Sequence, residues 1–178
     1  GVSQSYYEFQ QYLKDVKSLG VVLTVCSKND HENAIAGLNH PEGVLRPDDF
    51  IVIKANWENK HMNIAQIAAD LNILPESIVF VDDNPAEREI VRSQLPGVAV
   101  PPMDGVENYI TTIDRSGFFE VTTFSEDDLK RNEMYKNNVL RSAQIAAFGD
   151  YDEYLRSLEM HGIIDDFIPV YLARITQL

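Results

Sequence analysis

The sequence contains little cysteine, little positive charge and no long hydrophobic run. A single cysteine, Cys26, excludes an internal disulfide bond and is typical of a reducing compartment, so we expect a cytoplasmic protein. No apolar run approaches the roughly 20 residues of a membrane span, so we expect no membrane partner. Lys and Arg number 15 against 28 Asp and Glu, and the net charge of -13 argues against nucleic acid as the main partner. A small anionic substrate stays compatible with this charge, because local lysines and a metal ion can outweigh it.

Apolar, β-branched runs alternate with amphipathic helical patterns over residues 1–117. The predicted strands are Val21–Cys26, Ile51–Ile53, Ile78–Val81 and Val98–Val100. Strands that alternate with helices predict an α/β fold with a doubly wound parallel sheet. The single tryptophan, Trp57, is expected in the core or in a pocket wall. After residue 118 the pattern becomes helical, with helices predicted at 126–147 and 151–158. We therefore expect a core of residues 1–117, a helical extension of 118–158 and a final segment of 159–178.

Two adjacent carboxylates, Asp82 and Asp83, directly follow the third predicted strand. The carboxyl ends of strands are where α/β sheets bind ligands. Paired carboxylates there suit Mg²⁺, which takes one or two carboxylates together with waters and phosphate oxygens. The same residues also fit a plain helix start, with Asp83 or Asn84 as the N-cap. The two interpretations are compatible, and Asp82 and Asp83 are the predicted metal ligands.

Further polar residues are predicted at the same edge of the sheet. Ser27 follows the first strand and, with nearby helix N–H groups, can hold phosphate oxygens. Lys60 precedes the helix that leads to the third strand and can offset transition-state charge, a role for which Lys54 is the weaker candidate. Asn29 either binds phosphate or caps the next helix. A hydroxyl, an ammonium and two carboxylates together predict Mg²⁺-dependent handling of a phosphorylated small molecule.

These motifs resemble those of the haloacid dehalogenase (HAD) superfamily of phosphatases. The segment TVCSKN at 24–29 resembles the second motif of that superfamily, Lys60 the third, and VDDNP at 81–85 the fourth. The FkbH-like branch is the most similar, and its phrases recur as VCSKND at 25–30, KANWE at 54–58, DDNPAER at 82–88, LPGVAVP at 95–101, RSLEM at 156–160 and ARITQL at 173–178. The resemblance covers nearly the whole chain and implies a HAD-like Rossmannoid fold.

The FkbH-like branch implies a glyceryl transferase/phosphatase of polyketide biosynthesis. Such enzymes use Mg²⁺ to remove phosphate from a bisphosphorylated glycerate, and they load the glyceryl group as a thioester onto an acyl carrier protein. Lys60 is then catalytic, and Cys26 either carries the acyl group or is a small, inert core residue. Residues 159–178 resemble the opening of an acyltransferase-like domain, cut short.

One motif of the superfamily is absent from the sequence. The first motif, Asp-x-Asp-x-Thr at the end of the first strand, supplies the nucleophile and the general acid/base. We therefore expect an internal fragment that lacks this strand and is inactive alone. The missing strand belongs between Val21–Cys26 and Ile78–Val81. We expect it to come from another chain or another part of the polypeptide. The alternatives are that the two strands close up, or that water and a neighbouring molecule fill the gap.

Two other functions remain as alternatives. The first is a non-catalytic module that docks on a carrier protein. The second is a receiver-like phospho-acceptor domain, which also combines aspartates, a hydroxyl and a lysine. Receivers have their acidic pair first and their lysine last, whereas here Lys60 precedes Asp82 and Asp83, so the order of the motifs favours the phosphatase.

Overall fold

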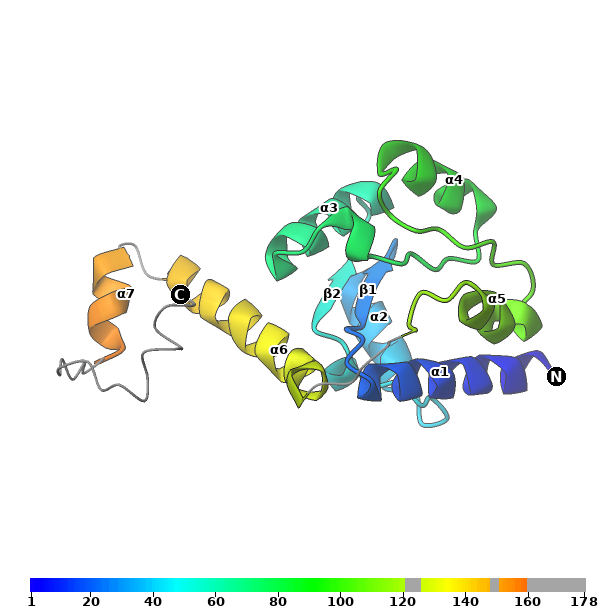
Figure 1. The fold of residues 1–178 in the computed structure, drawn as a ribbon, viewed down its shortest axis with the longest axis horizontal. Coiled ribbons are helices and arrows are strands. Elements are labelled where there is room, and N and C mark those ends of the chain that lie inside the picture. The colour runs from blue at the N-terminus through cyan, green and yellow to red at the C-terminus, as the bar shows by residue number, and fades with distance from the viewer. Residues whose placement is uncertain (121–125, 148–150, 160–178) are drawn as a thin grey trace, which may run out of the picture. The chain divides into compact units, whose positions relative to one another are not determined.

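The computed structural model describes residues 1–120, 126–147 and 151–159. The chain divides into two compact units, Gly1–Leu140 and Arg141–Leu178. The elements of the first unit are, in order, α1 (Val2–Ser18), β1 (Thr24–Ser27), α2 (His31–Leu38), η1 (Pro47–Asp49), β2 (Val52–Ala55), α3 (Lys60–Leu71), η2 (Pro75–Ser77), α4 (Pro85–Gln94), η3 (Val106–Asn108) and α5 (Tyr109–Arg115) (Figure 1). None of the helices in the described ranges is long and apolar enough to cross a membrane.

Two C-terminal helices confirm the helical pattern predicted after residue 118. Helix α6 (Glu126–Ala147) begins in the first unit and ends in the second, which also holds α7 (Tyr151–Ser157). The predicted start of an acyltransferase-like domain, 159–178, falls outside the described residues except at its first position. The division at residues 117 and 158 stays a prediction.

The first predicted strand pairs with the second. Strands β1 and β2 are parallel, in a register that places Thr24 beside Val52 and Ser27 beside Ala55. The N–H of Asn56 donates to Ser27 O at 3.1 Å, so the pairing reaches one residue past β2. Both strands begin and end later than predicted, because a strand follows its partner rather than the limits of an apolar run. Ser27 is therefore the last residue of β1 and not the first residue after it.

The third and fourth predicted strands meet at a single parallel bridge between Val79 and Ala99. The N–H of Phe80 donates to Ala99 O at 2.8 Å, and the N–H of Ala99 donates to Ile78 O at 3.0 Å. Among the described residues, no backbone hydrogen bond joins segment 78–81 to β1. The structure thus shows a small parallel sheet, β1–β2, in a helix-rich fold. The doubly wound sheet stays a prediction, because the third and fourth predicted strands form a single bridge within the described residues.

Two clusters of buried side chains hold the first unit together. In the first, Ile64 of α3, Val91 of α4 and Phe80 pack together with Val98, and Cys26 of β1 packs against them. The apolar faces of α3 and α4 thus cover residues from both β1 and segment 78–81, called the bridge segment below. Cys26 and Phe80 share this core although their backbones are not hydrogen-bonded to each other.

The second cluster joins the N-terminal helix to the segment after the bridge. Met103, Tyr109 and Ile113 are buried, and Phe9 and Tyr12 of α1 pack against them. The rings of Phe9 and Tyr109 meet edge to face, with centroids 5.3 Å apart. Figure 1 shows α1 and α5 side by side, as these contacts require.

Candidate functional site

The acidic turn, residues 82–84, leads from the bridge segment into α4. Asp82 is buried, and its Oδ2 accepts a hydrogen bond from Lys60 Nζ in an ion pair. Its Oδ1 accepts the N–H of Asn84 at 2.8 Å. Asn84 is the N-cap of α4, since its side-chain oxygen accepts the N–H of Ala86 at 2.9 Å. The predicted helix start is confirmed with Asn84 as its cap, and both carboxylate oxygens of Asp82 have partners.

Asp83 lies in a different environment from its neighbour. Its side chain is exposed, and no group among the described residues donates a hydrogen bond to its carboxylate. The same part of the chain holds no group of three or more His, Cys, Asp and Glu side chains that could bind a metal. Two carboxylates nevertheless fit Mg²⁺, which commonly completes its octahedron with waters and phosphate oxygens.

Lys60, and not Lys54, is the lysine that reaches the acidic turn. Lys60 is the first residue of α3, and its side chain is 14% exposed while that of Asp82 is 6% exposed. Lys54 Nζ instead pairs with Asp70 Oδ2 at 3.1 Å. The prediction that preferred Lys60 therefore agrees with the geometry, because Lys54 is occupied by a carboxylate on α3.

The β1 end, residues 26–29, contacts Lys60 through the thiol of Cys26. Cys26 Sγ donates to Lys60 O at 3.6 Å, and the side chain packs against the first core cluster. Burial raises the pKa of the Cys26 thiol from 9.0 to about 11, although the Lys60 ammonium acts in the opposite direction. A thiolate is therefore scarce at neutral pH, and Cys26 needs a proton acceptor before it can act as a nucleophile.

Ser27 and Asn29 are the predicted phosphate ligands at the β1 end. The hydroxyl of the half-buried Ser27 has no hydrogen-bond partner within the described part of the chain. Asn29 Oδ1 accepts the N–H of Asp30 at 2.9 Å, and Asp30 rather than Asn29 occupies the N-cap position of α2. The amide N–H groups of Asn29 and the hydroxyl of Ser27 are thus available donors, and their role in phosphate binding stays a prediction.

An ion pair that the motifs did not indicate connects the β1 end to α4. Lys28 Nζ lies 2.7 Å from Glu87 Oε1, and the Glu87 side chain is only 13% exposed. Glu87 Oε2 is buried and has no hydrogen-bond partner within the described residues. Lys60 therefore joins the β1 end to the acidic turn, and the Lys28–Glu87 pair joins the β1 end to α4.

The environments of Trp57 and Arg88 differ from what the sequence indicates. Trp57, expected in the core or a pocket wall, is 71% exposed, so this prediction is wrong as to burial. Its Nε1–H donates to Asp30 Oδ1 at 2.9 Å, so the polar group of the indole has a hydrogen-bond partner at the surface. Arg88 is buried against the acidic turn. The sequence assigns no role to this charged residue, which is only the last letter of the phrase DDNPAER. A charged residue in an amphipathic helix is normally placed at the surface, so no sequence signal identifies it.

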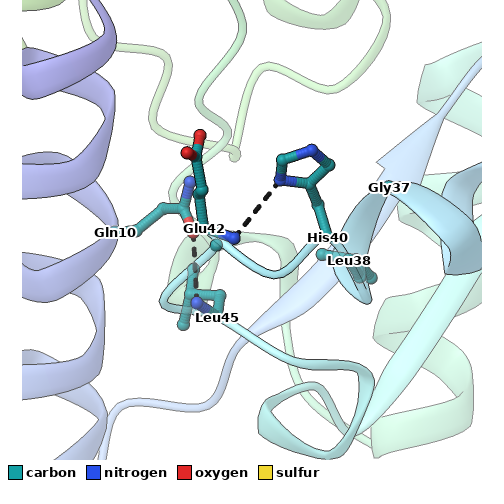
Figure 2. Close-up of a pocket in the computed structure, with 7 residues that line it drawn as sticks. Gln10, Gly37, Leu38, His40, Glu42 and Leu45 are labelled. Carbon is teal, nitrogen blue, oxygen red and sulfur yellow. Dashed lines mark hydrogen bonds between the residues drawn. The ribbon is translucent and has the colours of Figure 1, made fainter.

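A separate open pocket lies between α1 and the chain that follows α2, with a volume of about 380 Å³ (Figure 2). It is lined by Gln10, Gly37, Leu38, His40, Glu42, Gly43 and Leu45. Gln10 Oε1 accepts the N–H groups of Val44 at 2.9 Å and Leu45 at 3.1 Å, and His40 Nδ1 accepts that of Glu42 at 3.3 Å. The side chains of Gln10 and His40 thus hold the loop, and the pocket contains none of the predicted site residues.

The N-terminal part of a Bacteroides fragilis protein, which contains a phosphatase domain and was crystallised in complex with Mg, is similar to this chain. The two are 41% identical with a TM-score of 0.68, and the match covers 70% of this chain. This chain spans 34% of the length of that solved chain. A scan against protein-family models and a search of curated proteins find no match. The structural match supports a HAD-like phosphatase fold, whereas the FkbH-like branch stays a prediction.

Proposed function

We propose that this chain supplies the metal-binding and phosphate-binding half of a Mg²⁺-dependent phosphatase of the HAD type, acting on a phosphorylated small molecule. The Lys60–Asp82 ion pair, with the exposed Asp83 next to Asp82 in the chain, is the observation that carries the proposal. The carboxylates can bind the cation of a Mg²⁺–phosphate complex, and the ammonium of Lys60 can bind its anion. The phosphatase domain with Mg in the similar Bacteroides fragilis structure supports the same function.

Each polar residue of the site has a role in this proposal. Asp82 and Asp83 hold Mg²⁺, which when bound polarises the phosphoryl group and neutralises its negative charge. Lys60 stabilises charge on the phosphoryl oxygens, and its pair with Asp82 holds the ammonium in place. Ser27 donates its hydroxyl, and Asn29 its amide N–H groups, to the remaining phosphate oxygens.

The nucleophile comes from outside this sequence, which contains no Asp-x-Asp-x-Thr motif. We place it on a strand between β1 and segment 78–81, with its carboxyl end beside Lys60. Cys26 and Phe80 share one core cluster, yet the described residues of their two segments form no backbone hydrogen bond with each other. A strand between them would satisfy backbone groups on both sides. The chain by itself is therefore expected to show negligible phosphatase activity.

The finer proposal is that the parent enzyme is a cytoplasmic glyceryl transferase/phosphatase that loads an acyl carrier protein for polyketide biosynthesis. The FkbH-like phrases support it. Cys26 is the candidate carrier thiol: its sulfur attacks the carbonyl of an acyl phosphate, a thioester forms and phosphate leaves. The proton of the thiol goes to a base at the site, which the pKa of about 11 makes necessary.

Substitution of the two acids in a longer protein that contains the nucleophile tests the metal role. We expect Asp82→Asn and Asp83→Asn each to raise the Mg²⁺ concentration needed for half-maximal phosphate release and to lower turnover by about 100-fold or more. Glu89→Gln is the matched control, because Glu89 is an exposed acid on α4 that pairs with Arg92. If both aspartate variants keep an unchanged Mg²⁺ dependence and lose only about 1 kcal/mol of stability, Asp82 and Asp83 serve only the start of the helix.

A further inference from the structure

The guanidinium of Arg88 is buried against the acidic turn, although it carries a permanent charge. The residue is 7% exposed. Arg88 Nη1 donates to Asp82 O at 2.9 Å, to Asp83 O at 3.0 Å and to Met103 O at 3.2 Å. Arg88 Nη2 donates to Asp104 Oδ1 at 3.1 Å. One side chain on α4 therefore joins the acidic turn to the segment that follows the bridge.

The choice of acceptors distinguishes this arginine from an ordinary ion pair. Its one carboxylate partner, Asp104, has a side chain that is 81% exposed, and exposed pairs contribute little to stability. Its other acceptors are backbone carbonyls, and two of these belong to the predicted metal ligands, Asp82 and Asp83. A buried guanidinium needs such acceptors because unsatisfied donors are costly there. The result is that the backbone of both acidic residues is held by one rigid, planar group.

We infer that Arg88 is a positioning residue for metal binding, an inference that rests on the proposed Mg²⁺ site. By holding the carbonyls of Asp82 and Asp83, Arg88 fixes the spacing and direction of their carboxylates. Mg²⁺ requires near-ideal octahedral geometry, so a loss of this alignment weakens binding even if both carboxylates remain. Groups that orient metal ligands typically contribute about 10- to 100-fold to metal affinity.

The positive charge of Arg88 has a second consequence for the site. Together with Lys60 it offsets two of the three negative charges of Asp82, Asp83 and its partner Asp104 before any cation arrives. The bound cation then gives the site a net positive charge that suits a phosphate dianion. Replacement by lysine keeps this charge and removes the planar fork, so it separates alignment from charge.

Mn²⁺, a paramagnetic substitute for Mg²⁺, tests the inference on this chain without any turnover. Its affinity is read from the broadening of the backbone amide NMR signals of Asp83 and Asn84. We expect Arg88→Met to weaken Mn²⁺ binding by about 10- to 100-fold and Arg88→Lys by about tenfold. Arg92→Met should bind Mn²⁺ like the wild type, because Arg92 lies on the same helix with a side chain that is 48% exposed.

The outcomes separate failure of the inference from failure of the proposed function. If the amide signals show that Arg88→Met does not fold, the folded Arg88→Lys variant alone decides. Wild-type affinity in every folded Arg88 variant overturns the inference, while weaker affinity beside a normal Arg92→Met supports it. If the wild-type chain itself shows no broadening confined to the acidic turn, the metal site is refuted, and the role of Arg88 with it.

Discussion

The acidic turn and the β1 end are the two halves of the proposed site, and they are built in opposite ways. At the acidic turn both oxygens of Asp82 are hydrogen-bonded, Asn84 caps α4, and Arg88 holds the backbone carbonyls. At the β1 end the hydroxyl of Ser27 has no partner within the described residues, and the thiol of Cys26 is packed against apolar side chains.

The difference agrees with what each half is proposed to bind. A metal ion demands ligands that are aligned in advance, and a network of hydrogen bonds provides that alignment. A phosphate group needs donors that are free until it arrives, and the hydroxyl of Ser27 has no partner among the described residues. Lys60 belongs to both halves, since its ammonium pairs with Asp82 and its carbonyl accepts from Cys26. Changes on either side should therefore affect different steps.

The largest expected effect is at the β1 end. In a longer protein with the nucleophile, Cys26→Ser should abolish loading of the acyl carrier protein, because a hydroxyl is a far weaker acyl acceptor than a thiol. Release of the phosphate that the aspartate nucleophile removes should stay largely intact. Intact-mass measurement of the wild-type enzyme with substrate should show an adduct on the peptide that contains Cys26. Normal loading by the variant would make Cys26 a core residue only.

Lys60→Met should break the link between the two halves. We expect phosphate release to fall by about 100- to 1,000-fold, since the loss of one group aimed at developing charge typically has this effect. Lys54→Met is the matched control and should keep near-normal turnover, because Lys54 pairs with Asp70 on α3. Steady-state rates of both variants in the longer protein measure the difference. Equal losses in the two would contradict the assignment of Lys60.

The Lys28–Glu87 pair links the β1 end to α4, and its removal should affect stability. Lys28→Met leaves the buried Glu87 carboxylate without a counter-ion, and we expect a loss of about 2 kcal/mol in the free energy of unfolding. The double variant Lys28→Met/Glu87→Met should recover most of this loss, because no unpaired charge remains buried. Urea unfolding of the three chains measures both values. A double variant no more stable than Lys28→Met would refute the counter-ion argument.

The parts of the site that the sequence predicts are those set by neighbouring residues. Asp82, Asp83 and the cap at Asn84 follow one another directly, so one local pattern contains both the acids and the helix start. Ser27 directly precedes the turn into α2, and Lys60 is the first residue of α3, so each is found from the end of a single element.

The parts that the sequence does not predict depend on contacts between distant segments. Arg88 is buried because the carbonyl of Met103 and those of the acidic turn surround it, and no local pattern encodes that arrangement. Trp57 is exposed and donates its N–H to Asp30, in another loop, a contact that no local pattern predicts. Segments 78–81 and 98–100 are apolar enough for strands but form one bridge, since a strand needs a partner as well as a suitable sequence.

The smallest expected effect is the pH dependence of stability that arises at the β1 end. Because the pKa of the Cys26 thiol rises from 9.0 to about 11 on folding, the folded chain keeps a proton that the unfolded chain loses. This contribution is complete below pH 9 and disappears as the pH rises toward 11. The stability advantage of the wild type over Cys26→Ala should therefore fall by about 1 kcal/mol between pH 8.5 and pH 10.5, a figure reduced for the partial exposure of the thiol.

Urea unfolding at the two pH values, with a reductant present, measures this change. Asn84→Ala provides the comparison at the acidic turn: loss of the cap should cost about 1 kcal/mol at both pH values, because the amide does not titrate. A wild-type advantage over Cys26→Ala that stays constant across the range would show that the thiol is not desolvated. The β1 end would then be as open to water around Cys26 as it is at Ser27, and the contrast with the acidic turn would extend to the thiol itself.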